Sequence, residues 1–115
     1  MLELSYLSIQ NSITLILYNV TVKIEKAIAE EWLNWMKTVH IPDMMKTGYF
    51  VEHKICEILH DDEDGGITYA FQYFTKNMED FQTYQRDHAK ALQKDVATRY
   101  PNKYVAFRTL MKVLD

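Results

Sequence analysis

Apolar and polar residues alternate along four stretches of the chain, which is the spacing of strands that bury one face. The first stretch, residues 14–24, has a wholly apolar side that consists of Ile16, Tyr18, Val20, Val22 and Ile24. Residues 49–60, 67–75 and 104–114 follow the same spacing or are rich in β-branched and aromatic side chains. The pattern therefore predicts four strands.

Two stretches between these strands repeat apolar residues every three or four positions, as a helix that covers a core does. The first carries Ile28, Trp32, Trp35, Met36 and Val39, and the second carries Phe81, Tyr84, His88, Ala91, Leu92 and Val96. Asn77 is a good N-cap for the second helix, with Asp80 three positions later, and Pro101 ends this helix.

Pro42 divides the first helical stretch. A proline disfavours helical geometry at the preceding residue, so the helix is predicted to end near His40 and a short second turn to run on to Gly48. Trp32 and Trp35 are expected to be buried anchors, because aromatic stripes at helical spacing usually face a core. His40 lies at the expected break, where it either caps free carbonyl groups or belongs to a site.

The predicted order is strand, helix, strand, strand, helix, strand, in which right-handed crossovers place both helices on one face of the sheet. We therefore expect an α+β fold: a ferredoxin-like βαββαβ subunit whose antiparallel sheet and helices form two layers. The domain is expected to span residues 14–115, after an N-terminal extension of residues 1–13. A chain of 115 residues is long enough for one such core and too short for a second.

The sheet face opposite the helices is predicted to combine polar and apolar side chains. They are Asn19, Thr21, Gln72 and Arg108, together with Leu15, Leu17, Phe74, Leu110 and Leu114. An open sheet with this much apolar area is an association surface, so we expect a homodimer in which two sheets close into an α/β barrel. The phase of the second strand is ambiguous, and this strand adds either His53 and Glu57 or Glu52 and Lys54 to the same face.

Composition and charge restrict the classes of partner. The formal net charge of −3 disfavours nucleic acid or an anionic membrane as a partner. Cys56 is the only cysteine, so no internal disulfide forms and a reducing compartment fits. No apolar run approaches the roughly 20 residues of a membrane span, and no basic residue precedes the first strand as in a signal peptide, so a cytoplasmic location is expected.

No metal or cofactor signature stands out in the sequence. The four histidines are dispersed over the two predicted helices and the 49–60 strand without metal-ligand spacing, and the acidic run 61–64 lacks the alternate spacing of a calcium loop. No nucleophile motif or phosphate-binding loop is present either. We therefore expect neither a metal site nor a bound cofactor.

Several short runs resemble one bacterial family of short domains of unknown function. They are LYNVTV at 17–22, EWLNWM at 31–36, HIP at 40–42, TGYF at 47–50, QY at 72–73 and AFRT at 106–109. Residues 35–42 are also similar to a helix end of EthD-like proteins, within the dimeric α/β-barrel superfamily that includes antibiotic-biosynthesis monooxygenase-like proteins. This second resemblance implies a subunit that pairs into a barrel, and a fold able to host monooxygenase chemistry without a cofactor.

The leading functional hypothesis is a homodimer that binds a small apolar or aromatic ligand in the cavity on the sheet face opposite the helices. Asn19, Gln72 and Arg108 are the candidate ligand-binding residues, with His53 as a proton carrier and His40 near the mouth. One alternative is a dimerisation module without chemistry, and another is a monooxygenase-like enzyme that needs no cofactor. Binding of RNA to exposed strand aromatics is disfavoured by the acidic charge and by the missing RNA-binding signature.

Overall fold

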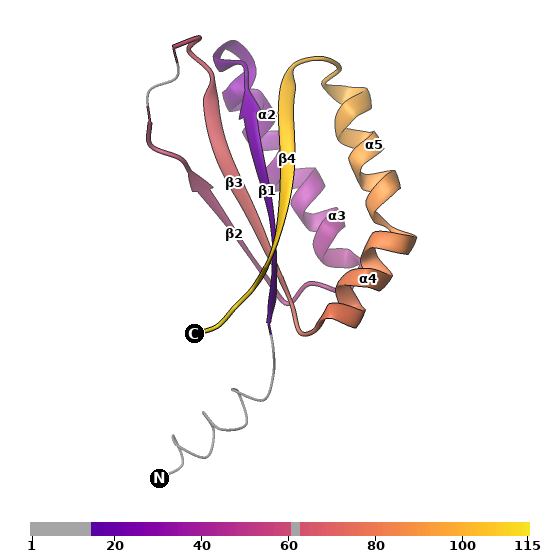
Figure 1. Cartoon of the computed structure of the whole chain (residues 1–115). Helices are drawn as coiled ribbons and strands as arrows, with labels where there is room; N and C mark the ends of the chain where they lie inside the picture. Colours follow the sequence, from indigo (N-terminus) through magenta and orange to yellow (C-terminus); the bar gives the residue numbers. More distant parts are fainter. Residues whose placement is uncertain (1–14, 61–62) are drawn as a thin grey trace.

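The computed structural model describes residues 15–60 and 63–115, in which four strands form one antiparallel sheet. The strands are β1 (Ile16–Ile24), β2 (Glu52–Glu57), β3 (Ile67–Thr75) and β4 (Tyr104–Lys112), in the order β2-β3-β1-β4. All the helices lie on one face of this sheet (Figure 1). The expected two-layer, ferredoxin-like α+β fold is confirmed, while the predicted extension 1–13 lies outside the described residues.

β1 is the centre of the sheet because its helix-facing side is wholly apolar. Tyr18, Val22 and Ile24 on this side are 4%, 4% and 1% exposed. The strand pairs with β3 on one side and with β4 on the other, so its residues fix the register of both neighbours. Residues directly opposite each other on paired strands point to the same face, and this rule assigns every strand residue to a face.

The first helical segment does not end at His40, contrary to the sequence prediction. It begins with a 3₁₀ turn, η1 (Lys26–Ile28). From α2 (Ala29–Trp35) it continues through the π-helical η2 (Met36–His40) into α3 (Ile41–Lys46), with helical dihedral angles at both junctions. The Ile41 amide donates to the Met36 carbonyl, five residues back. This wider turn accommodates Pro42, which has no amide hydrogen and whose ring would clash with a carbonyl in a regular α-helix.

The second predicted helix is divided into α4 (Met78–Asp87) and α5 (Ala89–Arg99). Its predicted start is confirmed: the Asp80 amide donates to the side-chain oxygen of Asn77 at 2.8 Å. The division falls at His88, whose φ of −128° leaves the helical range. The resulting bend keeps Tyr84 of α4 and Val96 of α5 both buried against the core, and α5 then runs beside β4 (Figure 1).

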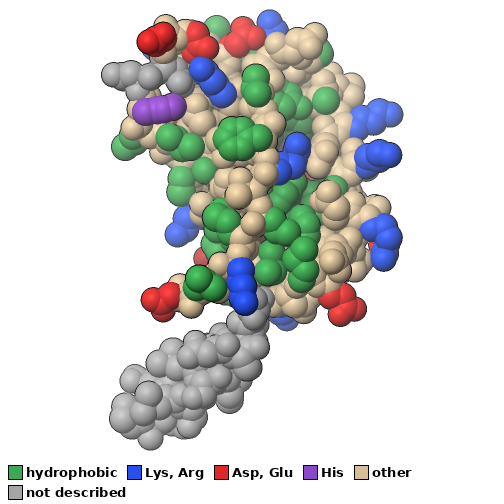
Figure 2. All heavy atoms as spheres, in the orientation of Figure 1, with side chains coloured by type: hydrophobic (Ala, Val, Ile, Leu, Met, Phe, Trp, Pro, Cys, Tyr) green, Lys and Arg blue, Asp and Glu red, His purple; other side chains and the backbone are tan. Residues whose placement is uncertain are grey.

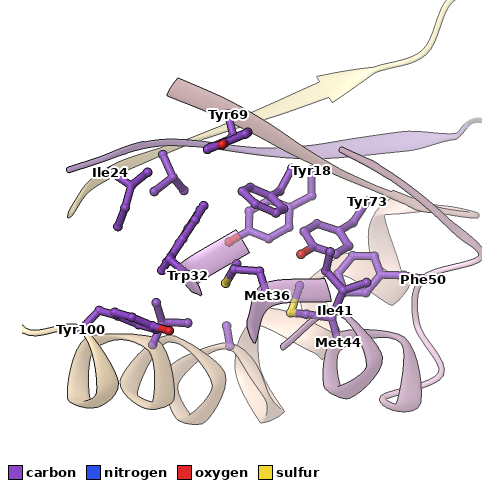
Figure 3. Close-up of a cluster of buried hydrophobic side chains, with 14 of the residues drawn as sticks. Tyr18, Ile24, Trp32, Met36, Ile41, Met44, Phe50, Tyr69, Tyr73 and Tyr100 are labelled. Carbon is purple, nitrogen blue, oxygen red and sulfur yellow. The ribbon is translucent and has the colours of Figure 1, made fainter. Parts of the chain in front are cut away.

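The core between sheet and helices is mostly aromatic (Figure 3). Trp32 is completely buried, and its ring lies 5.7 Å from that of Tyr69 and 5.4 Å from that of Phe71. The expected anchoring role fits Trp32 best. Trp35 is only half-buried and lies at the rim of the core, with its ring 5.7 Å from that of Tyr100 and 5.5 Å from the guanidinium carbon of Arg99.

The predicted phase of β4 is wrong. Arg108 lies opposite Val20, and Leu110 lies opposite Tyr18, so both belong to the helix-facing side of the sheet. The sequence misled because β4 is an edge strand with apolar residues in both alternating sets, and only its pairing with β1 decides which set faces the helices. Leu114, which was expected on the open face, lies beyond the end of the strand.

The open face of the sheet nevertheless carries an apolar surface, made of other residues than expected on β4. Its members from β4 are Val105, Phe107 and Met111, which are 69%, 62% and 38% exposed, and its neighbours from β1 and β3 are Leu17 and Phe74. The phase of β2 is also settled. Lys54 lies opposite Gln72, so Glu52 and Lys54 share the open face, whereas His53 and Glu57 face the helix side.

Candidate functional site

A cavity of about 40 Å³ lies between the helix-facing side of the sheet and the helices. Strands β1, β3 and β4 form one wall, and α2, η2, α3, α4 and α5 form the other. Most of the lining is apolar. The polar groups that reach the cavity come chiefly from Tyr18, Trp32, His40, Tyr73, Gln93 and Arg108.

Two buried donors in this lining have no hydrogen-bond partner among the described residues: the indole nitrogen of Trp32 and the hydroxyl of Tyr73. The two residues are 0% and 2% exposed, so solvent does not satisfy these groups. A buried polar group without a partner costs about 1–3 kcal/mol, and most proteins avoid it. Figure 3 shows the Tyr73 hydroxyl pointing from the sheet toward Met36, with the Tyr18 hydroxyl directed into the same layer beside Trp32.

Tyr18 and Arg108 connect the interior of the cavity to its mouth. Burial raises the pKa of Tyr18, and the positive charge of Arg108 and the nearby side chain of Gln93 oppose this rise. The Arg108 guanidinium therefore lies close to the Tyr18 hydroxyl. Because Arg108 is itself exposed while Tyr18 is buried, the arginine marks the side on which the cavity opens to solvent.

His40 enters the lining from the π-helical turn. Its ring stacks on Trp35 with centroids 5.9 Å apart. Burial lowers the pKa of His40 to about 4; the charges of Asp43 and Asp95 raise this pKa, and the charge of Arg108 lowers it. The imidazole is consequently neutral at pH 7, and a neutral imidazole offers one donor and one acceptor.

The buried tyrosines of the cavity remain protonated at neutral pH. Burial, followed by the neighbouring tyrosines, raises the pKa of Tyr73, and burial raises the pKa of Tyr84. The Tyr84 hydroxyl donates to the Met44 sulfur at 3.2 Å, so this donor has a partner, unlike that of Tyr73. The cavity therefore presents mainly hydrogen-bond donors.

The structure separates the residues that were expected to form one ligand site. The cavity brings His40 and Arg108 together. Asn19 and Gln72 lie opposite each other on β1 and β3, on the open face, and the Asn19 side-chain nitrogen donates to the Thr21 hydroxyl at 3.0 Å. The expectation that Arg108 shares a pocket with them is wrong, because of the β4 phase described above.

His53 lies apart from both groups. It borders an open groove of about 310 Å³ with Lys37, Ile41, Pro42 and Ile55, between β2 and the first helical segment. It therefore does not face the open sheet surface on which a proton-carrying role was predicted. Two candidate site residues were not predicted from the sequence: Trp32, which was expected only as a buried anchor, and Tyr73, to which no role was given. The available signal was an indole and a phenol on apolar faces, each of which needs a hydrogen-bond partner when buried.

Metal binding finds no support in the part of the chain that the structure describes, where no three His, Cys, Asp or Glu side chains come together. Among residues 15–60 and 63–115, no helix is long and apolar enough to cross a membrane.

A one-layer antiparallel sheet backed by helices, with the chain order found here, defines the ferredoxin-like class of α+β domains. The chain belongs to the family described as Domain of unknown function (DUF4286), whose model matches residues 15–114. The resemblance to a family of short domains of unknown function is thereby confirmed. No curated protein matches the sequence significantly.

Solved structures share the fold at low sequence identity. An ethyl tert-butyl ether D (EthD) family protein from Bacillus halodurans is 14% identical, with a TM-score of 0.60 over 82% of this chain and 96% of its own. A dimeric ferredoxin-like protein from an uncultured marine organism is 8% identical, with a TM-score of 0.62 over 89% and 97%. A putative antibiotic biosynthesis monooxygenase from Bacillus cereus is 8% identical, with a TM-score of 0.61 over 88% and 94%. The expected likeness to EthD and monooxygenase folds is confirmed.

Proposed function

We propose that this protein binds a small molecule in the cavity between the sheet and the helices. The observation that carries the proposal is the pair of buried donors, on Trp32 and Tyr73, that have no partner among the described residues and line the same cavity. A ligand with oxygen acceptors supplies the hydrogen bonds that the protein leaves unmade, and so offsets a cost that a purely structural core would not retain.

The size of the cavity limits what enters it. About 40 Å³ holds roughly three water-sized spheres, so a few heavy atoms fit without movement of the walls. The exposed position of Arg108 leaves the mouth accessible, and a larger ligand can place only its head group inside. This site replaces the cavity on the opposite face, where Arg108 was expected.

Phenol and acetamide are suitable neutral probes, because each carries a small polar head group. The chain has two tryptophans, so the indole N–H region of a proton–nitrogen NMR spectrum contains two side-chain signals. We expect millimolar probe to shift the Trp32 signal and to leave that of Trp35 nearly unchanged. Tyr73→Phe is expected to weaken the shift, whereas Gln72→Ala on the open face is the matched control and leaves it intact. If no probe moves the Trp32 signal, the cavity is not a binding site.

We also propose that the protein is a homodimer joined through the open sheet face. The supporting observation is the exposure of Val105 and Phe107, at 69% and 62%, beside the apolar Met111. Figure 2 shows hydrophobic side chains at the surface over the strands, with a few Lys and Arg side chains between them and others along the helix side. A solved protein of the same fold is described as dimeric, which is consistent with this use of the face.

Asn19 and Gln72 have a place in such a dimer. They lie in the middle of the open face, where two sheets that close into a barrel would cover Gln72 as well as Asn19, which is already buried. Their predicted role in ligand binding stays a prediction, and the alternative role of fixing the pairing register fits the same position. A monooxygenase-like activity also stays a prediction, and the neutral imidazole of His40 is the group in the cavity best suited to accept a proton.

Sedimentation velocity at micromolar concentration tests the dimer. Wild type is expected at twice the 13.7 kDa of the chain. Phe107→Glu places a charge in the centre of the apolar surface and is expected to yield a monomer, while Val39→Glu, at an apolar residue that is 40% exposed on η2, is the control and stays dimeric. A monomeric wild type would rule out the barrel.

A further inference from the structure

The described lining of the cavity carries positive charge but no negative charge. Arg108 is the only lining residue with a formal charge at neutral pH, since His40 is neutral and no Asp or Glu occurs among the described lining residues. Asp43 and Asp95 act on His40 from α3 and α5 but do not line the cavity. A guanidinium at the mouth of a small, mostly apolar cavity, without a carboxylate in the lining to neutralise it, favours a negatively charged ligand.

No ion pair at Arg108 is present among the described residues, although other pairs form at the surface. Lys23 pairs with Asp64 at 2.9 Å, Arg86 with Asp87 at 2.8 Å, and Lys103 with Glu25 at 3.8 Å. The residues nearest to Arg108 across the sheet and the cavity include Val20 and Tyr18, neither of which is acidic. The charge of this arginine therefore remains available to a ligand.

The hydrogen-bond donors of the cavity favour the same kind of ligand as the positive charge of Arg108. The Trp32 indole and the Tyr73 hydroxyl are unpaired donors, and Arg108 and Gln93 add N–H donors near the Tyr18 hydroxyl. A ligand that suits this set has several oxygen acceptors and few donors. A carboxylate has this composition, because its oxygens accept hydrogen bonds and share one negative charge.

From this geometry we infer that the ligand is a small organic carboxylate, held by Arg108 and Tyr18 at the mouth, with the Trp32 and Tyr73 donors available to its further oxygen atoms. This inference rests on the proposed binding function of the cavity, and it specifies the class of ligand. It also explains why an arginine stands on the helix-facing side of β4, in a set whose neighbours across β1 are Tyr18, Val20 and Val22.

Acetate and acetamide separate this inference from the proposed function, because they have nearly the same shape and differ in charge. We expect acetate to bind about fivefold or more tightly than acetamide, as judged from the Trp32 indole shift, because hydrogen bonds to a charged acceptor are roughly twice as strong as neutral ones. Sodium chloride at the same ionic strength is the reference, and the preference is expected to shrink as salt is added.

Arg108→Gln is the diagnostic variant and Lys112→Gln is its matched control. Both remove one positive charge from the same face of β4, but only Arg108 lines the cavity. Arg108→Gln is expected to abolish the preference for acetate while acetamide still shifts the Trp32 signal, and Lys112→Gln is expected to keep the preference. Circular dichroism and thermal melting of both variants confirm that the fold is retained.

The experiment distinguishes failure of the inferred ligand class from failure of the proposed binding function. If acetamide and acetate bind equally in wild type, the cavity is a binding site but the inference of an anionic ligand is wrong. If neither moves the Trp32 signal, the proposed function fails together with the inference. Retention of the acetate preference in Arg108→Gln would also overturn the role assigned to this arginine.

Discussion

Among the described residues, the two faces of the sheet differ in which groups they leave without a partner, apolar side chains on one and hydrogen-bonding groups on the other. On the open face the buried Asn19 is satisfied within the chain, since its side-chain amide donates to the Thr21 hydroxyl, and apolar side chains such as Phe107 are left exposed. On the helix-facing side the apolar side chains of β1 and β3 are mostly buried, and the polar groups of Trp32 and Tyr73 lack partners among the described residues. The first face is thus suited to a second sheet, and the other to a small ligand with acceptors.

If both proposals hold, one sheet separates assembly from ligand binding. Side chains alternate between the two faces, so neighbours in sequence face opposite sides of the sheet. Phe107 is exposed on the open face, while the next residue, Arg108, lines the cavity on the opposite side. A substitution at one of these positions is therefore expected to change either association or ligand binding, and to leave the other property nearly unaffected.

The largest expected effect on stability comes from a substitution in the core on the helix-facing side of the sheet. Trp32→Ala removes a completely buried indole that packs on Tyr69 and Phe71, and it is expected to lower the free energy of unfolding by about 3–5 kcal/mol. Trp35→Ala, at the half-buried rim, is the control and is expected to cost clearly less. Denaturant titration of both variants measures the difference. Equal losses would show that the two tryptophans contribute alike to the core.

Acidification is expected to lower the folding stability by a smaller amount, through protonation of His40. The pKa of His40 is about 4 in the folded protein and 6.5 ordinarily, so between these values the unfolded chain binds more protons than the folded one. The stability contributed by neutral His40 is therefore fully present above about pH 6.5 and is lost as the pH falls toward 4, by no more than about 3 kcal/mol.

The His40→Gln variant isolates this contribution. The groups that face the imidazole are Asp43, Asp95, Arg108 and the Trp35 ring, and all are retained in the variant. Urea titrations of both proteins at pH 7 and pH 4.5 are expected to show a steeper loss of stability for wild type. Parallel losses in the two proteins would mean that His40 is not held neutral by burial.

Much of the fold follows from the sequence because local rules decide it. The alternation of β1 and β3 correctly assigned their apolar faces, and Asn77 correctly marked a helix start. β4 was assigned to the wrong face because both of its alternating sets contain apolar residues, so its phase depends on pairing with β1 across a long sequence separation. The course of the helix past His40 likewise depends on a π-helical turn that Pro42 alone did not predict.

The candidate site was less accessible to sequence reasoning. The sequence singled out His40 and Arg108, and the structure places both in the lining of one cavity. The elements that bring them together, η2 and β4, are those whose geometry the sequence did not settle. Trp32 and Tyr73 matter because their polar atoms have no partner among the described residues, and the absence of a partner is a property of the folded arrangement. The sequence indicates only that an indole and a phenol lie on apolar faces, and not whether each of them finds a partner.

The stability of Tyr73→Phe tests most directly whether the helix-facing side retains an unsatisfied donor for a ligand. Phenylalanine removes the hydroxyl and its desolvation cost, so without ligand the variant is predicted to equal wild type or to exceed it by about 1 kcal/mol in free energy of unfolding. Tyr84→Phe is the matched control, and it is predicted to lose about 0.5–1.5 kcal/mol, because its hydroxyl donates to Met44. A loss of about 1 kcal/mol or more in Tyr73→Phe would contradict the account, since it would show that this hydroxyl already has a partner within the protein.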